Sequence, residues 1–137
     1  MAVVEELVRG EANGAVSFGN YRLDTKSKKE DVEIAGDLYK VKTFYEITKL
    51  EKNGMFVYES VPGTAVTDFQ AWEDGLRFTV WGSRDAEITV QLEESAQYVI
   101  TFDGEQHGLM ETNRSGKLSM GVSLDEEKPV RVEITRR

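Results

Sequence analysis

Hydrophobic and polar residues alternate with a period of two along several segments in the second half of the chain. Leu76, Phe78 and Val80 alternate with more polar positions, and the pattern recurs over residues 87–92, 98–103, 118–124 and 130–135. Successive side chains of a strand point to opposite faces of a sheet, so each segment presents one apolar and one polar face. The pattern predicts antiparallel sheets that are covered on one side.

Two dipeptides predict tight hairpins between such segments, because Asn, Asp and Gly tolerate the positive φ that a two-residue turn needs. A two-residue turn at Asn53-Gly54 places Lys49 opposite Tyr58 and Glu51 opposite Phe56. It predicts one buried face with the members Tyr45, Ile47, Phe56 and Tyr58. A second turn at Asp103-Gly104 places Ile100 opposite His107 and Tyr98 opposite Leu109.

Helical periodicity is nearly absent from the rest of the chain. Residues 2–10 fit a short helix or an edge strand about equally well, and the charged run Asp24 to Asp31 is typical of an exposed loop. No stretch rich in proline, glycine or serine separates two domains. We therefore expect one all-β domain over residues 1–137. Its predicted architecture is a two-sheet antiparallel β-sandwich, jelly-roll-like or immunoglobulin-like, with roughly ten strands.

Composition narrows the classes of function. The 137 residues include no cysteine and a single histidine, and the formal net charge is −8. Disulfides and thiolate metal sites are excluded, and we expect no metal and no cofactor. With no basic cluster evident along the chain, we expect no nucleic-acid partner. No export signal or membrane-length apolar segment is evident, so we expect no membrane partner and a cytoplasmic location.

No spacing typical of a catalytic motif occurs, and no catalytic residue is assigned. The register above places His107 on an inward face, where a hydrogen-bonded structural histidine is the expected interpretation. Neighbouring acidic residues are frequent. Asp125 to Glu127 and Glu73-Asp74 are the loop positions where a calcium ion is the alternative to simple solvation. A carboxylate pair for glycoside hydrolysis is a further alternative, but sequence neighbours in a strand point to opposite faces.

Aromatic residues provide the candidate ligand-binding positions. Trp72 lies in a turn-like stretch, Trp81 falls on the polar side of its strand, and Tyr21 is the third member of this set. Exposed aromatic rings on a sandwich face stack against the apolar faces of sugars. The alternative is structural, with Trp72 covering one end of the core and Trp81 packing under a loop or a subunit contact.

Two stretches resemble known proteins. The C-terminal third resembles the accessory β-sandwich modules of bacterial glycosidases, in a hairpin and turn pattern with the matching positions Tyr98, Asp103, Gly104, Thr112, Asn113, Ser115, Gly116, Lys117 and Leu118. Residues 36–66 resemble small stand-alone β-sandwich proteins of gut Firmicutes, some of which are described as endosialidase-like. Sialidases are six-bladed propellers with Asp-box motifs, and this chain has neither that length nor those motifs.

These observations favour a non-catalytic protein that acts in binding or assembly. Self-association is expected, through an edge strand or the face that carries Trp81. The alternative is a carbohydrate-binding module or accessory domain related to glycan-processing enzymes, with a glycan held by Trp72, Trp81 and Tyr21. A small glycan-active enzyme ranks last.

Overall fold

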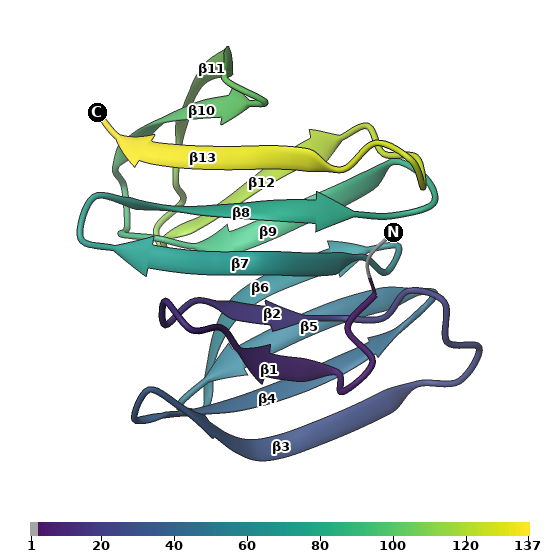
Figure 1. Ribbon diagram of the computed structural model, residues 1–137. Helices are drawn as coiled ribbons and strands as arrows, with labels where there is room; N and C mark the ends of the chain where they lie inside the picture. The colour runs from purple at the N-terminus through teal and green to yellow at the C-terminus, as the bar shows by residue number, and fades with distance from the viewer. Residues whose placement is uncertain (1–2) are drawn as a thin grey trace.

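The computed structural model describes residues 3–137, which form an antiparallel β-sandwich of two sheets. In Figure 1 the seven-stranded sheet lies in front of the six-stranded one. Across the seven-stranded sheet the order is β1 (Val8–Gly10), β2 (Val16–Phe18), β7 (Ala65–Trp72), β8 (Gly75–Trp81), β13 (Val130–Arg136), β10 (Gln97–Phe102) and β11 (Glu105–Glu111). Across the other it is β12 (Lys117–Val122), β9 (Ala86–Gln91), β6 (Met55–Val61), β5 (Ile47–Lys52), β4 (Asp37–Phe44) and β3 (Ser27–Ile34).

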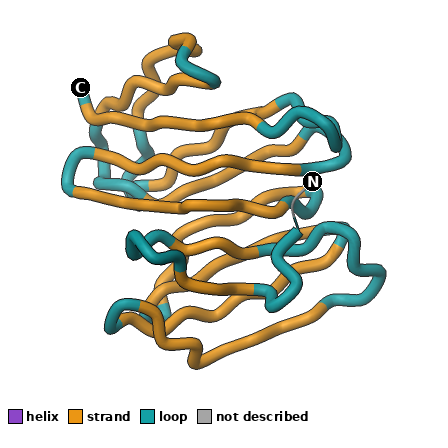
Figure 2. Tube along the Cα trace, in the orientation of Figure 1, coloured by secondary structure: helices purple, strands orange, loops and turns teal. Residues whose placement is uncertain are grey.

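The predicted all-β sandwich is confirmed. Figure 2 shows strands and loops, and no helix of membrane-spanning length and hydropathy occurs within residues 3–137. The described residues form thirteen strands rather than roughly ten. The difference comes partly from the short strands β1 and β2, which are too short to show an alternation in sequence.

The alternating residues supply the core between the sheets. Leu76, Phe78 and Val80 of β8 are buried, as are Ile88 and Val90 of β9. At the centre, the Phe18 and Tyr58 rings meet edge to face with centroids 5.1 Å apart, which joins the two sheets. Burying each large apolar side chain stabilises the fold by about 2 kcal/mol, so this cluster provides the main driving force for sheet packing.

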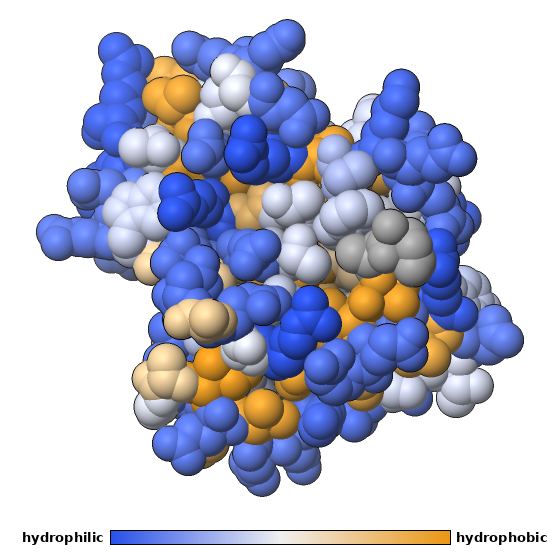
Figure 3. Space-filling view, in the orientation of Figure 1, coloured by the Kyte–Doolittle hydropathy of each residue, from blue (hydrophilic) through white to orange (hydrophobic). Residues whose placement is uncertain are grey.

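The outer face of the seven-stranded sheet is mainly hydrophilic over β13 and β8, as the alternation requires (Figure 3). Hydrophobic atoms gather in the lower half of this view, in the region of β1 and β2. β1 lies at the edge of its sheet, so residues 8–10 form an edge strand rather than a helix. The first two residues of the chain lie outside the described part.

The predicted hairpin at Asn53-Gly54 forms, but its register is correct only next to the turn. Glu51 lies opposite Phe56 as expected, whereas a β-bulge then places Leu50, not Lys49, opposite Tyr58. The extra residue exchanges the two faces of the strand, because side chains alternate with a period of two. The predicted single buried face is therefore wrong: Tyr58 is buried, but Ile47 and Phe56 are only partly buried. Tyr45 lies in the β4–β5 turn and is 46% exposed.

The hairpin at Asp103-Gly104 contains a bulge of the same kind. Thr101 lies opposite Gln106, but Ile100 lies opposite Gly108, so His107 is the extra residue. The predicted inward position of His107 beside Ile100 is wrong, because His107 is exposed and its ring lies against Phe102 at a centroid distance of 4.5 Å. A bulge residue has no direct cross-strand partner and can turn outward.

The charged run at residues 24–31 is a loop only in its first part. From Ser27 onward it belongs to β3, which pairs with β4 and forms an edge of the six-stranded sheet. Charged side chains and a bulge after Lys29 are typical of edge strands, where they discourage pairing with other chains. The density of charged residues therefore predicted correctly that this segment is exposed. It predicted incorrectly that the whole segment is a loop, since part of it is a strand.

Candidate functional site

Loops from distant parts of the sequence gather at one end of the sandwich. The register places the start of β7 beside the ends of β2 and β8, through the pairs Phe18–Val66 and Ala65–Trp81. The loops at residues 19–26, 45–46, 62–64, 82–85 and 123–129 accordingly lie at this end, on the right of Figure 1.

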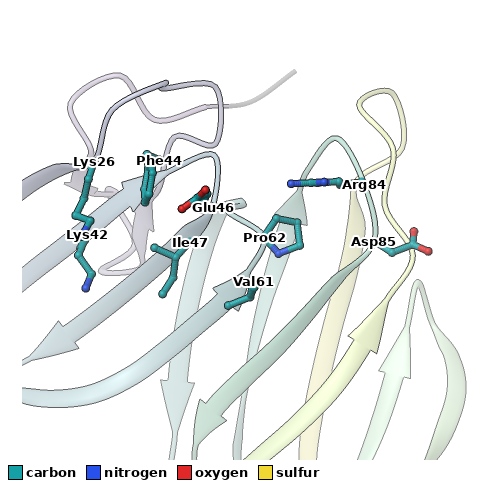
Figure 4. A pocket seen from close by; sticks show the side chains of 9 residues that line it. All are labelled: Lys26, Lys42, Phe44, Glu46, Ile47, Val61, Pro62, Arg84 and Asp85. Carbon is teal, nitrogen blue, oxygen red and sulfur yellow. The ribbon is translucent and has the colours of Figure 1, made fainter.

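These loops surround an open pocket of about 660 Å³, which we call the loop-end pocket (Figure 4). Its apolar part consists of Phe44, Ile47, Val61 and Pro62, and its charged part of Lys26, Lys42, Glu46, Arg84 and Asp85. The residues come from β4, β5, β6 and four different loops. The volume is in the range of pockets that hold small molecules.

A buried network of hydroxyl groups holds the β6–β7 loop in place beneath this pocket. The Thr48 hydroxyl donates to the carbonyl of Thr64 at 2.7 Å and accepts the Thr64 N–H at 3.1 Å. Thr43 must then donate to Thr48, across 2.8 Å, because the single Thr48 proton is already used. On the other side, the Thr64 hydroxyl contacts the hydroxyls of Tyr58 and Ser60, each at 2.8 Å. Burial raises the pKa of Tyr58 well above its usual value, so it stays a neutral hydrogen-bonding group.

The β6–β7 loop also depends on a glycine. The Gly63 N–H donates to the Tyr45 carbonyl at 3.0 Å, which ties this loop to the β4–β5 turn. A Cβ atom at Gly63 would lie 2.0 Å from the carbonyl oxygen of Phe44, so only glycine fits there. The two loops that carry the pocket are thus held by backbone contacts and by the hydroxyl network, and the pocket is largely preformed.

Charged groups of both signs lie around the pocket. In Figure 4, Arg84 extends over Pro62, and Lys26 and Lys42 lie beyond Phe44 on the opposite side. The Glu46 carboxylate, hydrogen-bonded to the Tyr45 hydroxyl, raises the pKa of Tyr45, while the charge of Arg84 opposes this effect. The Tyr45 ring meets Phe44 edge to face, with centroids 5.3 Å apart. Tyr45 does not line the pocket itself, and its exposed ring adjoins the Phe44 side chain that does.

The carboxylates of the pocket do not form a pair. Asp85 accepts the backbone N–H of Leu124 at 3.1 Å and points away from Glu46 in Figure 4. Hydrolysis of a glycoside needs two carboxyl groups that face each other across the scissile bond. Between residues 3 and 137, no group of three or more histidine or acidic side chains is placed to hold a metal ion. The loop-end pocket therefore offers a concave surface, apolar side chains and charged groups, which are the features that a ligand-binding site uses.

The three aromatic residues singled out from the sequence do not share one surface. Trp72 and Trp81 lie at opposite ends of the β7–β8 ladder, opposite Gly75 and Ala65, and six residues of strand separate them by about 20 Å. Trp72 is 43% exposed, whereas Trp81 is partly buried and donates its indole N–H to Thr67 at 3.2 Å. Tyr21 is 5% exposed.

Two of the carboxylates considered for calcium, Asp125 and Glu126, have other partners. Asp125 accepts the backbone N–H of Glu127 at 2.8 Å, and Glu126 forms an ion pair with Arg22. The Tyr21 hydroxyl donates to the same Glu126 carboxylate at 3.5 Å. These contacts fasten the β12–β13 loop to the loop after β2.

Sequence reasoning missed the residues that line the pocket. Phe44, Glu46 and Ile47 line the pocket at a two-residue turn formed by Tyr45 and Glu46, and neither turn residue has a positive φ. The turn therefore lacks the Asn-Gly or Asp-Gly signal. A usable signal was the apolar pair Val61-Pro62 followed by glycine, because proline is confined to strand ends and edges.

Comparison of the chain with protein-family models, with curated proteins and with solved structures finds no match in any of the three.

Proposed function

We propose that this protein is a non-catalytic binding protein and that the loop-end pocket is its ligand site. One observation carries the proposal: an open, apolar-walled pocket lies on loops that are already held in place by the buried hydroxyl network. Preformed loops reduce the ordering cost of binding, which favours affinity. The separated carboxylates Glu46 and Asp85 support binding over catalysis.

A saccharide is the ligand class that this lining favours. Phe44 and Tyr45 together present an aromatic corner, and the apolar faces of sugar rings stack on aromatic surfaces. Glu46, Arg84 and Lys42 supply acceptors and donors for hydroxyl groups around the rim. The proposal therefore shares its ligand class, a saccharide, with the carbohydrate-binding module considered from the sequence. The proposed site lies at Phe44 and Tyr45 rather than at the two tryptophans.

An array of neutral and acidic oligosaccharides tests the proposal, followed by calorimetric titration of the bound members. Tyr45→Ala should weaken binding up to about tenfold through loss of the stacked ring. Trp72→Ala is the matched control, because it removes an aromatic ring of similar exposure at the other end of the sandwich. Equal affinity of Tyr45→Ala and the original protein, or an array without any bound saccharide, contradicts the proposal.

Self-association is the second candidate function, and the edge strand β12 favours it. β12 pairs with β9 in continuous register from Lys117 to Val122, and its other side has no strand neighbour in the described part of the chain. A regular edge without a bulge offers backbone groups to a second copy. Light scattering after size exclusion measures the mass directly, and a monomer mass at every concentration contradicts this candidate.

A further inference from the structure

Three lysines lie side by side on the outer face of the six-stranded sheet. Lys28 of β3 is directly opposite Lys42 of β4, and Lys42 is directly opposite Lys49 of β5. Lys42 lies between the buried residues Val41 and Thr43, so its side chain points outward, and its cross-strand partners share that face. We call these three residues the lysine row. Their separation in sequence conceals it, because only the strand register brings them together.

Like charges are directly opposed within the lysine row. Directly opposed side chains have Cβ atoms about 5 Å apart, and like charges in such pairs destabilise a sheet. Lys49 has the Glu51 carboxylate 3.9 Å away, but among residues 3–137 neither Lys28 nor Lys42 forms an ion pair. The chain as a whole carries a charge of −8, so this row is a local concentration of positive charge on an acidic protein. An anionic ligand would relieve the repulsion.

The lysine row is continuous with the loop-end pocket. Lys42 lines that pocket, and it also lines a small hollow of about 60 Å³ together with Lys28, Lys40, Lys49 and Glu51. Lys26, whose ammonium group lies 6.0 Å from the centre of the Phe44 ring, borders the pocket on the same side. A ligand longer than one ring can therefore leave the pocket over Lys42 and follow the sheet face.

Resting on the proposed function, we infer that the ligand is an acidic saccharide chain, with one ring in the loop-end pocket and its anionic groups along the lysine row. Acidic side chains flank the row, with Glu51 beside Lys49 and Glu59 directly opposite it. Carboxylates accept hydrogen bonds from sugar hydroxyls, whereas they repel a backbone as densely charged as that of nucleic acid. A saccharide that carries both hydroxyl and anionic groups matches this mixture.

Calorimetric titration with matched probe pairs tests the inference. The pairs are oligogalacturonate with its neutral methyl ester, and carboxymethyl dextran of low substitution with dextran. At low salt the protein should bind the acidic member of at least one pair about tenfold more tightly than the neutral member, and added salt should reduce this ratio. The double variant Lys28→Gln/Lys49→Gln, at two row positions that do not line the loop-end pocket, should lose the preference and retain its affinity for the neutral member.

The control variant Lys52→Gln/Lys128→Gln removes the same charge from positions outside the lysine row and should keep the preference. Both double variants are checked by urea unfolding, where loss of the like-charged neighbours on both sides of Lys42 should leave Lys28→Gln/Lys49→Gln at least as stable as the original protein. Equal binding of acidic and neutral members overturns the inference and leaves the pocket proposal intact. If the protein binds single-stranded DNA through these lysines and binds no saccharide, the lysine row is a nucleic-acid site. That result overturns both the acidic-saccharide inference and the proposed saccharide site in the pocket.

Discussion

Replacing Thr48 by valine should lower the stability of this protein more than any exposed threonine would. Valine has nearly the same shape, so the change removes one hydroxyl from a site that is 0% exposed. Three groups lose their partner: the N–H and the carbonyl of Thr64 and the hydroxyl proton of Thr43. An unsatisfied buried polar group costs about 1–3 kcal/mol, and partial relaxation leaves a total of about 3 kcal/mol.

Urea unfolding measures this loss. With a slope of about 2 kcal/mol per molar, a destabilisation of about 3 kcal/mol moves the unfolding midpoint down by about 1.5 M. Thr89→Val is the matched control, because the Thr89 hydroxyl pairs with Ser119 on the exposed face at 2.7 Å. The control should change stability by less than about 0.5 kcal/mol. Equal midpoints for Thr48→Val and Thr89→Val would refute the assigned role of the hydroxyl network.

The same variant connects stability to the site. The Thr48 hydroxyl holds both backbone groups of Thr64, which ends the β6–β7 loop, so its loss should also loosen Val61 and Pro62 in the pocket wall. Hydrogen exchange reports this directly, with faster exchange at the Thr64 amide than in the core strands. Unchanged protection of that amide would show that the loop is held by other contacts.

Three further perturbations follow from single contacts. Gly63→Ala should lower the free energy of unfolding by at least about 2 kcal/mol, because the new Cβ would meet a backbone oxygen at 2.0 Å. Gly121 has open space around it, so Gly121→Ala should leave the free energy of unfolding unchanged in the same urea assay. Hydrogen bonds from the Ser17 hydroxyl and from Arg9 lower the pKa of Glu11 below its ordinary value of 4.5. The stability that this lowered pKa contributes is present above pH 4.5 and is lost as pH falls through the folded-state pKa. The unfolding free energy, measured down to about pH 2, should therefore fall less steeply in Glu11→Gln than in the original protein. Parallel pH profiles of the two proteins would contradict this. Iodide should quench the fluorescence of Trp72 in a Trp81→Phe variant more strongly than that of Trp81 in Trp72→Phe, and the reverse order would contradict the observed exposures.

The fold class was predictable because its determinants are local. Residues two apart, such as Phe78 and Val80, lie on the same face of any strand, whatever the strand pairs with. The turns at Asn53-Gly54 and Asp103-Gly104 were predictable for a similar reason, since φ is 53° at Asn53 and 52° at Asp103, in the left-handed region that these residues tolerate.

The strand register beyond each turn was not predictable from the sequence. A bulge inserts one residue without a sequence signal; one bulge put Phe56 and Tyr58 on opposite faces, and the other left His107 without a cross-strand partner. The expected aromatic platform depended on which ends of β7 and β8 lie together, and the pairing of Trp72 with Gly75 separates it from Trp81.

The alternation of residue types by itself determined that this chain forms two-faced strands, because the geometry of a strand is the same in every context. Only the tertiary structure decided which strands are neighbours, and hence that Lys28, Lys42 and Lys49 stand in one row. It also decided that Phe44, Pro62 and Arg84 border one pocket. The pocket depends on packing between residues distant in sequence, whose energies arise from the whole core. The lysine row depends on the register of the β3–β4 and β4–β5 hairpins, which is set by a bulge after Lys29 and by a turn without an Asn-Gly or Asp-Gly signal.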